Sequence, residues 1–419
     1  MKMLRLSVCT VGALYMLFGC AAQPKGELFD PSEVQSASAY KFWDAKLPLV
    51  PGDAVHRCYL IDENLYVVSE QGEMFALQAD TGLLRWTRKV AEPQFTVYRP
   101  SHLDTGDDSG PLAIATTRNL LIFDRYSGDE LARFPMPFAP GSGPVGDATR
   151  IYMGSADGHM YSMLWCHAAG NRLLDRWRVV AGGPVTAMPT LRDGRTLIFA
   201  SQGGQVISCD SLDKSFIWGW RNREGIFGDP FVDDSGVYVA GADRSLYRLD
   251  VRTGRELWRY RFPGPLVDGP IVSRFTCYQS CPGAGLFAID VDSGEMKWQR
   301  KDGICFVASR PGEAVIRTTG RTLDVVDDAT GETKRSIGAQ HVCDTAVNVH
   351  GDSVFAVSAD GRVACLKPAG VPYLKRQEVA AARTVLDRPA NRSGEIARRS
   401  AGTVDEERDP LRSRYDSGN

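Results

Sequence analysis

Short runs of apolar, β-branched and aromatic residues alternate with tight-turn signals along most of this 419-residue chain. Typical runs are 65–68 (LYVV), 151–153 (IYM), 197–199 (LIF), 237–239 (VYV) and 354–357 (VFAV). Many are followed by a residue pair that tolerates positive φ in a two-residue hairpin, such as Gln71-Gly72, Asp157-Gly158, Gly203-Gly204 and Asp360-Gly361. The pattern predicts many short antiparallel strands joined by hairpins.

One segment recurs at a regular spacing. Residues 74–86 read MFALQADTGLLRW, residues 246–258 read LYRLDVRTGRELW and residues 286–298 read LFAIDVDSGEMKW. In each copy a turn glycine precedes a tryptophan by four residues. Weaker copies, which bring the number to eight, lie at 120–128, 161–177 (with an insertion), 206–218, 323–331 and 363–370. The mean spacing of about 41 residues is typical of four-stranded propeller blades.

This repeat predicts an all-β fold, because one four-stranded sheet cannot bury both of its faces. Eight sheets arranged radially stack face to face, so we expect an eight-bladed β-propeller of four-stranded antiparallel blades over residues 40–375. The last repeat ends at Gly370 without a tryptophan strand, and residues 40–47 (YKFWDAKL) supply such a strand, with Trp43 in the tryptophan position. We therefore expect the N-terminal strand to close the last blade.

Both ends of the chain differ from the repeats. Residues 1–19 read as a signal peptide, with Lys2 and Arg5 before a 13-residue apolar stretch that is short for a bilayer span. The following Gly19-Cys20 resembles the lipobox of bacterial lipoproteins, which implies lipidation (palmitate included) at Cys20; the alternative is an ordinary signal peptide. Residues 20–39 read as a flexible tether. Residues 376–419 read as a disordered charged tail, with 379–386 a candidate short helix.

Charge and cysteine content narrow the chemistry further. The formal net charge of −2 gives no basic excess with which to bind nucleic acid. Ten cysteines are present, and Cys277 and Cys281 lie four apart next to Pro282. They form a candidate disulfide, with two free thiols as the alternative. Cys209 and Cys365 occupy the apolar column of the repeat and are expected to be buried.

The segment Ala76 to Trp86 reads A-L-x-A-x-T-G-x-x-x-W and resembles the repeat of the PQQ-like propeller family over residues 40–370. The resemblance implies that the repeat tryptophans pack between blades and are structural: Trp43, Trp86, Trp218, Trp258 and Trp298. The dehydrogenases of this family bind PQQ and Ca²⁺ and carry an adjacent Cys-Cys pair, which this sequence lacks. No carboxylate set has a calcium-ligand pattern. We therefore predict no catalytic residue, no metal and no cofactor.

The aspartates that recur four residues before the turn glycine have a structural interpretation. They are Asp124, Asp250, Asp290 and Asp327. Because they return in blade after blade, we expect them to cap turns through side-chain hydrogen bonds and not to form one active site.

The order of signal peptide, lipidated cysteine, tether and eight blades resembles the BamB branch of the family. This implies a non-catalytic lipoprotein on the periplasmic side of the outer membrane that binds envelope proteins, the BamA-type barrel-assembly core among them. The candidate partner loops hold Phe227 and Asp229 in one and Leu266 and Asp268 in the other; alternatively, both loops simply lead into strands. The alternatives are a propeller lipoprotein that binds a different envelope partner or a polysaccharide, or a PQQ-dependent dehydrogenase.

Overall fold

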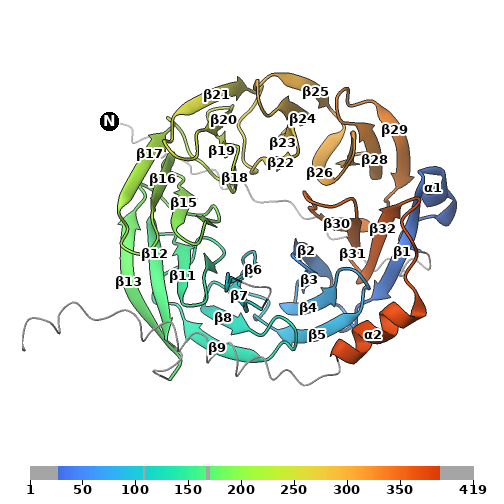
Figure 1. Ribbon diagram of the computed structural model, residues 1–419, viewed down its shortest axis with the longest axis horizontal. Coiled ribbons are helices and arrows are strands. Elements are labelled where there is room, and N and C mark those ends of the chain that lie inside the picture. The colour runs from blue at the N-terminus through green and yellow to red at the C-terminus, as the bar shows by residue number, and fades with distance from the viewer. Residues whose placement is uncertain (1–26, 107–108, 167–169, 387–419) are drawn as a thin grey trace, which may run out of the picture.

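The computed structural model describes residues 27–106, 109–166 and 170–386. These residues form eight four-stranded antiparallel sheets arranged as blades around a central axis (Figure 1). The predicted eight-bladed β-propeller is therefore confirmed. Cys20 and the segment expected to be a signal peptide lie outside the described residues, as do residues 387–419.

Each blade runs from an inner strand at the channel to an outer strand at the rim. Blade 1 contains β2 (Val55–Ile61), β3 (Asn64–Ser69), β4 (Glu73–Gln78) and β5 (Leu84–Lys89). Blade 2 contains β6 (Ser101–His102), β7 (Leu112–Ala115), β8 (Asn119–Phe123) and β9 (Glu130–Pro135). Blade 3 contains β10 (Val145–Gly146), β11 (Arg150–Gly154), β12 (His159–Cys166) and β13 (Arg172–Val180). Blade 4 contains β14 (Thr190–Arg192), β15 (Thr196–Ala200), β16 (Gln205–Asp210) and β17 (Phe216–Arg221).

The second half of the ring repeats this order. Blade 5 contains β18 (Phe231–Asp233), β19 (Gly236–Gly241), β20 (Ser245–Leu249) and β21 (Glu256–Arg261). Blade 6 contains β22 (Ile271–Ser273), β23 (Thr276–Cys281), β24 (Gly285–Asp290) and β25 (Met296–Arg300). Blade 7 contains β26 (Gly303–Arg310), β27 (Glu313–Thr318), β28 (Thr322–Asp327) and β29 (Thr333–Gly338). Blade 8 contains β30 (Val342–Ala346), β31 (Val354–Ser358), β32 (Arg362–Pro368) and β1 (Ala39–Lys46).

The ring closes through both ends of the chain. Strand β1 pairs antiparallel with β32 and forms the outer strand of blade 8, with Trp43 opposite Cys365. The N-terminal strand thus completes the last blade, as predicted. Because blade 8 is built from both ends, backbone hydrogen bonds between β1 and β32 hold the ring shut.

The repeat tryptophans connect neighbouring blades. Each indole N–H donates to a backbone carbonyl of the next blade: Trp43 to Ala79 (2.8 Å), Trp86 to Arg125 (3.0 Å), Trp218 to Val251 (3.0 Å), Trp258 to Val291 (2.8 Å) and Trp298 to Asp328 (3.0 Å). Each ring also covers the turn glycine of that next blade, and no side chain fits between them: a β-carbon on Gly82 would lie 2.4 Å from Trp43 Cε3. This is the packing between blades that the family resemblance implies.

The recurrent aspartates have the structural role expected from their regular spacing. In Asp250, for example, Oδ1 accepts the backbone N–H groups of Arg252 (3.1 Å) and Thr253 (2.8 Å), and the same pattern recurs at Asp124, Asp290 and Asp327. The hydroxyl of Thr253 also donates to Asp250. The hydrogen bonds from the Thr253 hydroxyl and from the two backbone N–H groups lower the pKa of the Asp250 carboxyl. The carboxylate therefore stays ionised and keeps the turn closed.

The tether prediction is wrong from residue 27 onward. Residues 31–36 form helix α1 (Pro31–Ser36), which begins after the capping residue Asp30 and contacts both β1 and β29. Val34 is only 3% exposed and belongs to a core cluster shared with blades 7 and 8. The Glu33 carboxylate accepts the backbone N–H of Gly338 at 2.7 Å. We call residues 27–38 the N-terminal clasp, because they cover the junction between blades 7 and 8.

The prediction of a disordered tail is wrong for residues 376–386. Residues 376–386 form helix α2 (Arg376–Leu386), which extends the candidate short helix at 379–386 by three residues. Its N-terminus is capped by the Glu378 carboxylate, which accepts the backbone N–H of Lys375 at 2.8 Å. α1 and α2 lie at the same side of the ring (Figure 1).

The proposed Cys277–Cys281 disulfide is not formed; both cysteines are free and buried. They lie on one strand, β23, which continues through Cys281. Residues four apart on an extended strand are about 13 Å from each other, too far for a disulfide. Cys209 and Cys365 are buried as expected, and burial raises the pKa of each thiol to about 12.

An ion pair at the closure makes a testable contribution to acid stability. Lys46 of β1 lies 2.9 Å from the Asp360 carboxylate, in the turn before β32. Burial acts to raise the pKa of Asp360, but hydrogen bonds from Ser358 and Lys46 outweigh it and lower the pKa to about 2. The folded pKa lies below the unfolded value of about 3.9, so this stabilisation is complete above about pH 5. It is lost as the pH falls towards 2.

We expect Lys46→Met to raise the pKa of Asp360 towards its ordinary value, as measured by NMR titration of the carboxyl carbon. The variant should lose stability at pH 7 and approach the wild type near pH 2, because the carboxyl is then protonated in both proteins. Arg259→Met, on an exposed outer strand, is the control for loss of a surface charge. A stability difference that does not depend on pH would contradict this role of the pair.

Candidate functional site

The central channel holds a cavity of about 770 Å³ lined by residues of blades 1, 2, 5, 6 and 8. Strand β2 contributes Arg57 and Tyr59, and strand β30 contributes Asp344. The segments leading into β18 and β22 contribute Asp229 and Asp268. Both predicted partner loops therefore border the channel, and both lead directly into inner strands, as the alternative interpretation expected.

The two loops contact each other through their glycines. A β-carbon on Gly228 would lie 2.1 Å from the backbone nitrogen of Gly269, and one on Gly269 would lie 2.2 Å from the carbonyl oxygen of Asp229. The loops are thus packed backbone against backbone, which is possible only where neither residue has a side chain. Residues 227–230 and 266–270 consequently form one continuous surface, which we call the channel mouth.

The side chains of the channel mouth do not all face solvent. Phe227 and Val267 are 43% and 46% exposed, and Asp268 is exposed. Leu266, which was predicted to contact a partner, is completely buried in the core of blades 5 and 6. It is therefore a structural residue, and Val267, which was not predicted, takes its place on the surface.

Opposite charges face each other at the channel mouth. Arg99, in the segment leading into β6, lies 3.7 Å from the Asp229 carboxylate. Asp229 Oδ1 also accepts the backbone N–H of Met188 at 2.7 Å, so three blades meet at this carboxylate. Elsewhere in the cavity, Asp344 accepts the backbone N–H of Cys58 at 2.9 Å and lies 3.9 Å from Arg57. Asp229 and Asp344 are thus both paired with groups of the channel wall.

Sequence reasoning missed Arg57, Arg99 and Asp344. Nothing in the repeat marks them, because the conspicuous positions of the repeat lie on the third and outer strands. The available signal is a charged residue on the first strand of a repeat, or just before it, because this strand faces the channel.

Three cysteines lie on neighbouring inner strands, namely Cys58 on β2, Cys305 on β26 and Cys343 on β30. Burial raises the pKa of Cys58 well above its ordinary value and raises the pKa values of Cys305 and Cys343 to about 11. Thiols with such pKa values remain protonated at neutral pH and are weak nucleophiles. They offer no activated cysteine to the channel.

One group of side chains has the spacing of metal ligands. Within residues 27–106, 109–166 and 170–386, Asp62, Glu63 and His102 are the one set of three or more such side chains with ligand atoms within 4.8 Å of each other. The buried guanidinium of Arg125 lies 3.5 Å from Asp62, 3.4 Å from Glu63 and 2.8 Å from His102 Nδ1. This positive charge neutralises the acids and would repel a cation. This group is therefore poorly suited to hold the Ca²⁺ of the dehydrogenase branch.

No helix among the described residues is long and apolar enough to cross a bilayer.

Comparison with known proteins gives a consistent picture. The family model described as "Outer membrane protein assembly factor BamB" matches residues 164–370. Curated proteins of that name from Nitrosomonas eutropha and Bordetella pertussis are 23% and 24% identical over 161 and 208 residues. These matches cover 37% and 46% of this chain and 38% and 45% of the relatives, so the chain spans less than half of their length. A quinoprotein ethanol dehydrogenase from Pseudomonas putida is 29% identical over 98 residues, which are 21% of this chain and 16% of that enzyme.

Solved structures support the same architecture. The crystal structure of BamB from Moraxella catarrhalis superposes with a TM-score of 0.63 at 15% identity and covers 80% of this chain and 99% of that one. A computationally designed protein, Ika8, superposes with a TM-score of 0.59 at 14% identity and covers 76% of this chain and 98% of its own. Identities this low show the fold alone. Together with the repeat and the family match, they show that this chain is a PQQ-like β-propeller related to BamB.

Proposed function

We propose that this protein is a non-catalytic lipoprotein of the cell envelope, anchored through Cys20 on the periplasmic side of the outer membrane. Its role is to bind other proteins during outer-membrane protein assembly, with the BamA-type barrel-assembly core as the expected partner. The similarity to the assembly factor BamB supports this role. The buried Arg125 guanidinium beside Asp62 and Glu63 would repel a cation, which argues against Ca²⁺ at this group and favours the binding role over the dehydrogenase alternative.

The channel mouth carries the proposal. Phe227 and Val267 are large apolar side chains on adjacent loops, and both are more than two-fifths exposed. The backbone contact between Gly228 and Gly269 holds the loops in place, so binding does not have to order them first. Charged groups surround the apolar pair, with Asp268 exposed and Arg99 paired to Asp229. An apolar centre with a charged rim is the usual anatomy of a protein-binding surface.

The test is an affinity purification of the tagged, lipidated protein from detergent-solubilised envelopes, with mass spectrometry of the bound proteins. We expect the wild type to recover the barrel-assembly core. The double variant Phe227→Ser, Val267→Ser should bind about thirtyfold more weakly, because each apolar contact at the centre of an interface contributes about 1 kcal/mol.

A matched control uses Leu212→Ser with Phe275→Ser. Phe275 lies at the other end of β22 from Val267, and Leu212 lies at the other end of β17 from Phe227. Phe275 is 71% exposed and Leu212 is 40% exposed, so the control removes a similar apolar area from the opposite face of the propeller. Equal losses in both double variants would contradict binding at the channel mouth. Recovery of no assembly component by membrane-bound wild type would overturn the assembly role and leave a different partner or a polysaccharide as the ligand.

A further inference from the structure

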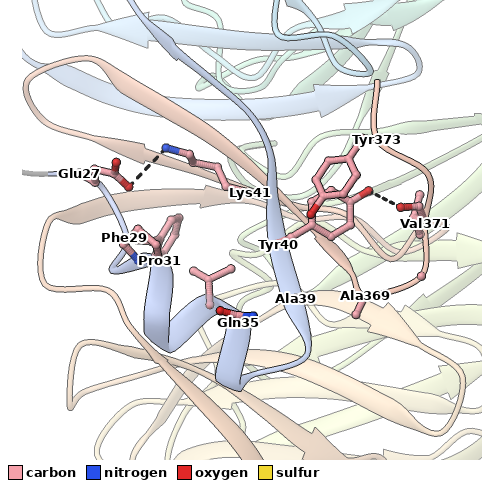
Figure 2. Close-up of a pocket in the computed structure, with 12 residues that line it drawn as sticks. Glu27, Phe29, Pro31, Gln35, Ala39, Tyr40, Lys41, Ala369, Val371 and Tyr373 are labelled. Carbon is pink, nitrogen blue, oxygen red and sulfur yellow. Dashed lines mark hydrogen bonds and ion pairs between the residues drawn. The ribbon is translucent and has the colours of Figure 1, made fainter. Parts of the chain in front are cut away.

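The two ends of the described chain leave the propeller at one edge. A groove of about 520 Å³ lies between the N-terminal clasp and residues 369–373, as Figure 2 shows. The Tyr40 hydroxyl donates to the Val371 carbonyl at 2.7 Å, and the Tyr40 ring lies 4.5 Å from the ring of Tyr373. These contacts fix the segment from which α2 starts. α2 therefore starts from a segment that borders the same groove as the N-terminal clasp.

The position of the proposed anchor limits where a membrane can lie. This step rests on the proposed function, because it requires lipidation of Cys20. Glu27, at the groove, is seven residues from Cys20, and a chain of that length spans at most about 25 Å however it is folded. The edge that carries the clasp and α2 must therefore stay near the bilayer, whatever the rest of the ring does.

The acidic groups at this edge are engaged within the protein. Glu27 pairs with Lys41 at 3.4 Å, and Glu33 accepts the backbone N–H of Gly338. Asp30 caps α1 by accepting the backbone N–H of Ser32 at 2.8 Å, and Glu378 caps α2. Their negative charges are thereby partly compensated by partners that belong to the fold.

The basic groups of the α2 segment are not engaged in this way. Lys375, Arg376 and Arg383 are exposed, and none of them forms a side-chain hydrogen bond or ion pair with another described residue. Tyr373, just before them, is 69% exposed. An exposed tyrosine beside unpaired lysine and arginine is the composition found where proteins contact the bilayer interface.

We propose that residues 373–383 are a second membrane contact, which lies on an anionic phospholipid surface and orients the propeller with blade 8 towards the bilayer. A basic residue near such a surface contributes about 1 kcal/mol, so three of them add a salt-sensitive attraction to the single lipid anchor. The channel axis is then held in a defined orientation to the membrane, and the channel mouth is presented to partners in the periplasm.

The test uses the lipidated full-length protein, reconstituted on vesicles of phosphatidylcholine with or without phosphatidylglycerol. Its readout is the rate at which an amine-reactive reagent labels Lys375, measured by mass spectrometry relative to the exposed Lys301 on another blade. We expect labelling of Lys375 to be about fivefold slower on the anionic vesicles, and the protection to disappear at high salt. Labelling of Lys301 should be the same on both.

Charge-reversal variants separate this contact from general electrostatics. Arg376→Glu with Arg383→Glu should abolish the protection, whereas Arg252→Glu with Arg255→Glu on blade 5 changes the net charge equally and should preserve it. Equal labelling of Lys375 on both vesicle types, with the protein floating with them, would overturn this inference and leave the proposed function intact. A protein that floats with neither vesicle has no anchor, and the inference then falls with the lipidation.

Discussion

Gly82→Ala is expected to lower the free energy of unfolding by about 2–5 kcal/mol. Gly82 has a φ of +69°, a left-handed conformation that costs other residues about 1–2 kcal/mol. The new β-carbon would also lie 2.4 Å from Trp43 Cε3, and such overpacking typically costs about 1–3 kcal/mol more. Because Trp43 comes from β1 and Gly82 from blade 1, the substitution acts on the contact between the last and first blades. Urea unfolding monitored by circular dichroism measures it.

Gly312→Ala is the matched control. Gly312 also has a φ of +69°, but a β-carbon there would meet no atom within 4 Å. Gly312→Ala should therefore lower the free energy of unfolding only by the cost of the left-handed conformation, about 1–2 kcal/mol. Equal losses in the two variants would mean that contact with the tryptophan does not limit the size of the turn residue.

The second large effect is expected in the N-terminal clasp. Val34→Asp should cost about 3–5 kcal/mol, because it places an unpaired carboxylate in a position that is 3% exposed between blades 7 and 8. Thermal unfolding followed by circular dichroism would show the loss as a lower Tm. The neighbouring Gln35→Asp introduces the same residue at an exposed position and should change the stability by less than about 0.5 kcal/mol.

This pair of variants also distinguishes a clasp from a tether. If residues 27–38 were a flexible linker, Val34→Asp and Gln35→Asp would be equally harmless. In that case the ring would be closed by β1 and the tryptophan contacts alone.

Sequence alone was sufficient for the repeating part of the molecule. The strand pattern, the capping aspartates and the tryptophan that contacts the next turn glycine are all local features, and each depends on residues within one repeat and the start of the next. The missing outer strand after Gly370 and the spare strand around Trp43 were therefore enough to predict how the ring closes. Repetition made these predictions robust, since each position could be compared across several blades.

The features that lie outside the repeat pattern could be seen only in the tertiary structure. Helix α1 has six residues, too few to be stable in isolation, and it forms because Val34 finds a buried site at the junction of two blades. The spacing of Cys277 and Cys281 suggested a loop disulfide, but pairing with β24 extends β23 through both residues and keeps their thiols apart. Sequence likewise placed Leu266 in a loop, whereas its side chain turns into the core and exposes Val267 instead.

The channel mouth depends on the closed ring in the same way. Arg99 and Asp229 are 130 positions apart in the sequence and come from blades 2 and 5, yet the circular arrangement brings their charges to 3.7 Å. Gly228 and Gly269 approach each other only because consecutive blades present equivalent loops side by side. A repeat sequence thus determines the blade and the number of blades. The contacts across the channel depend on the closure geometry, which no single repeat contains.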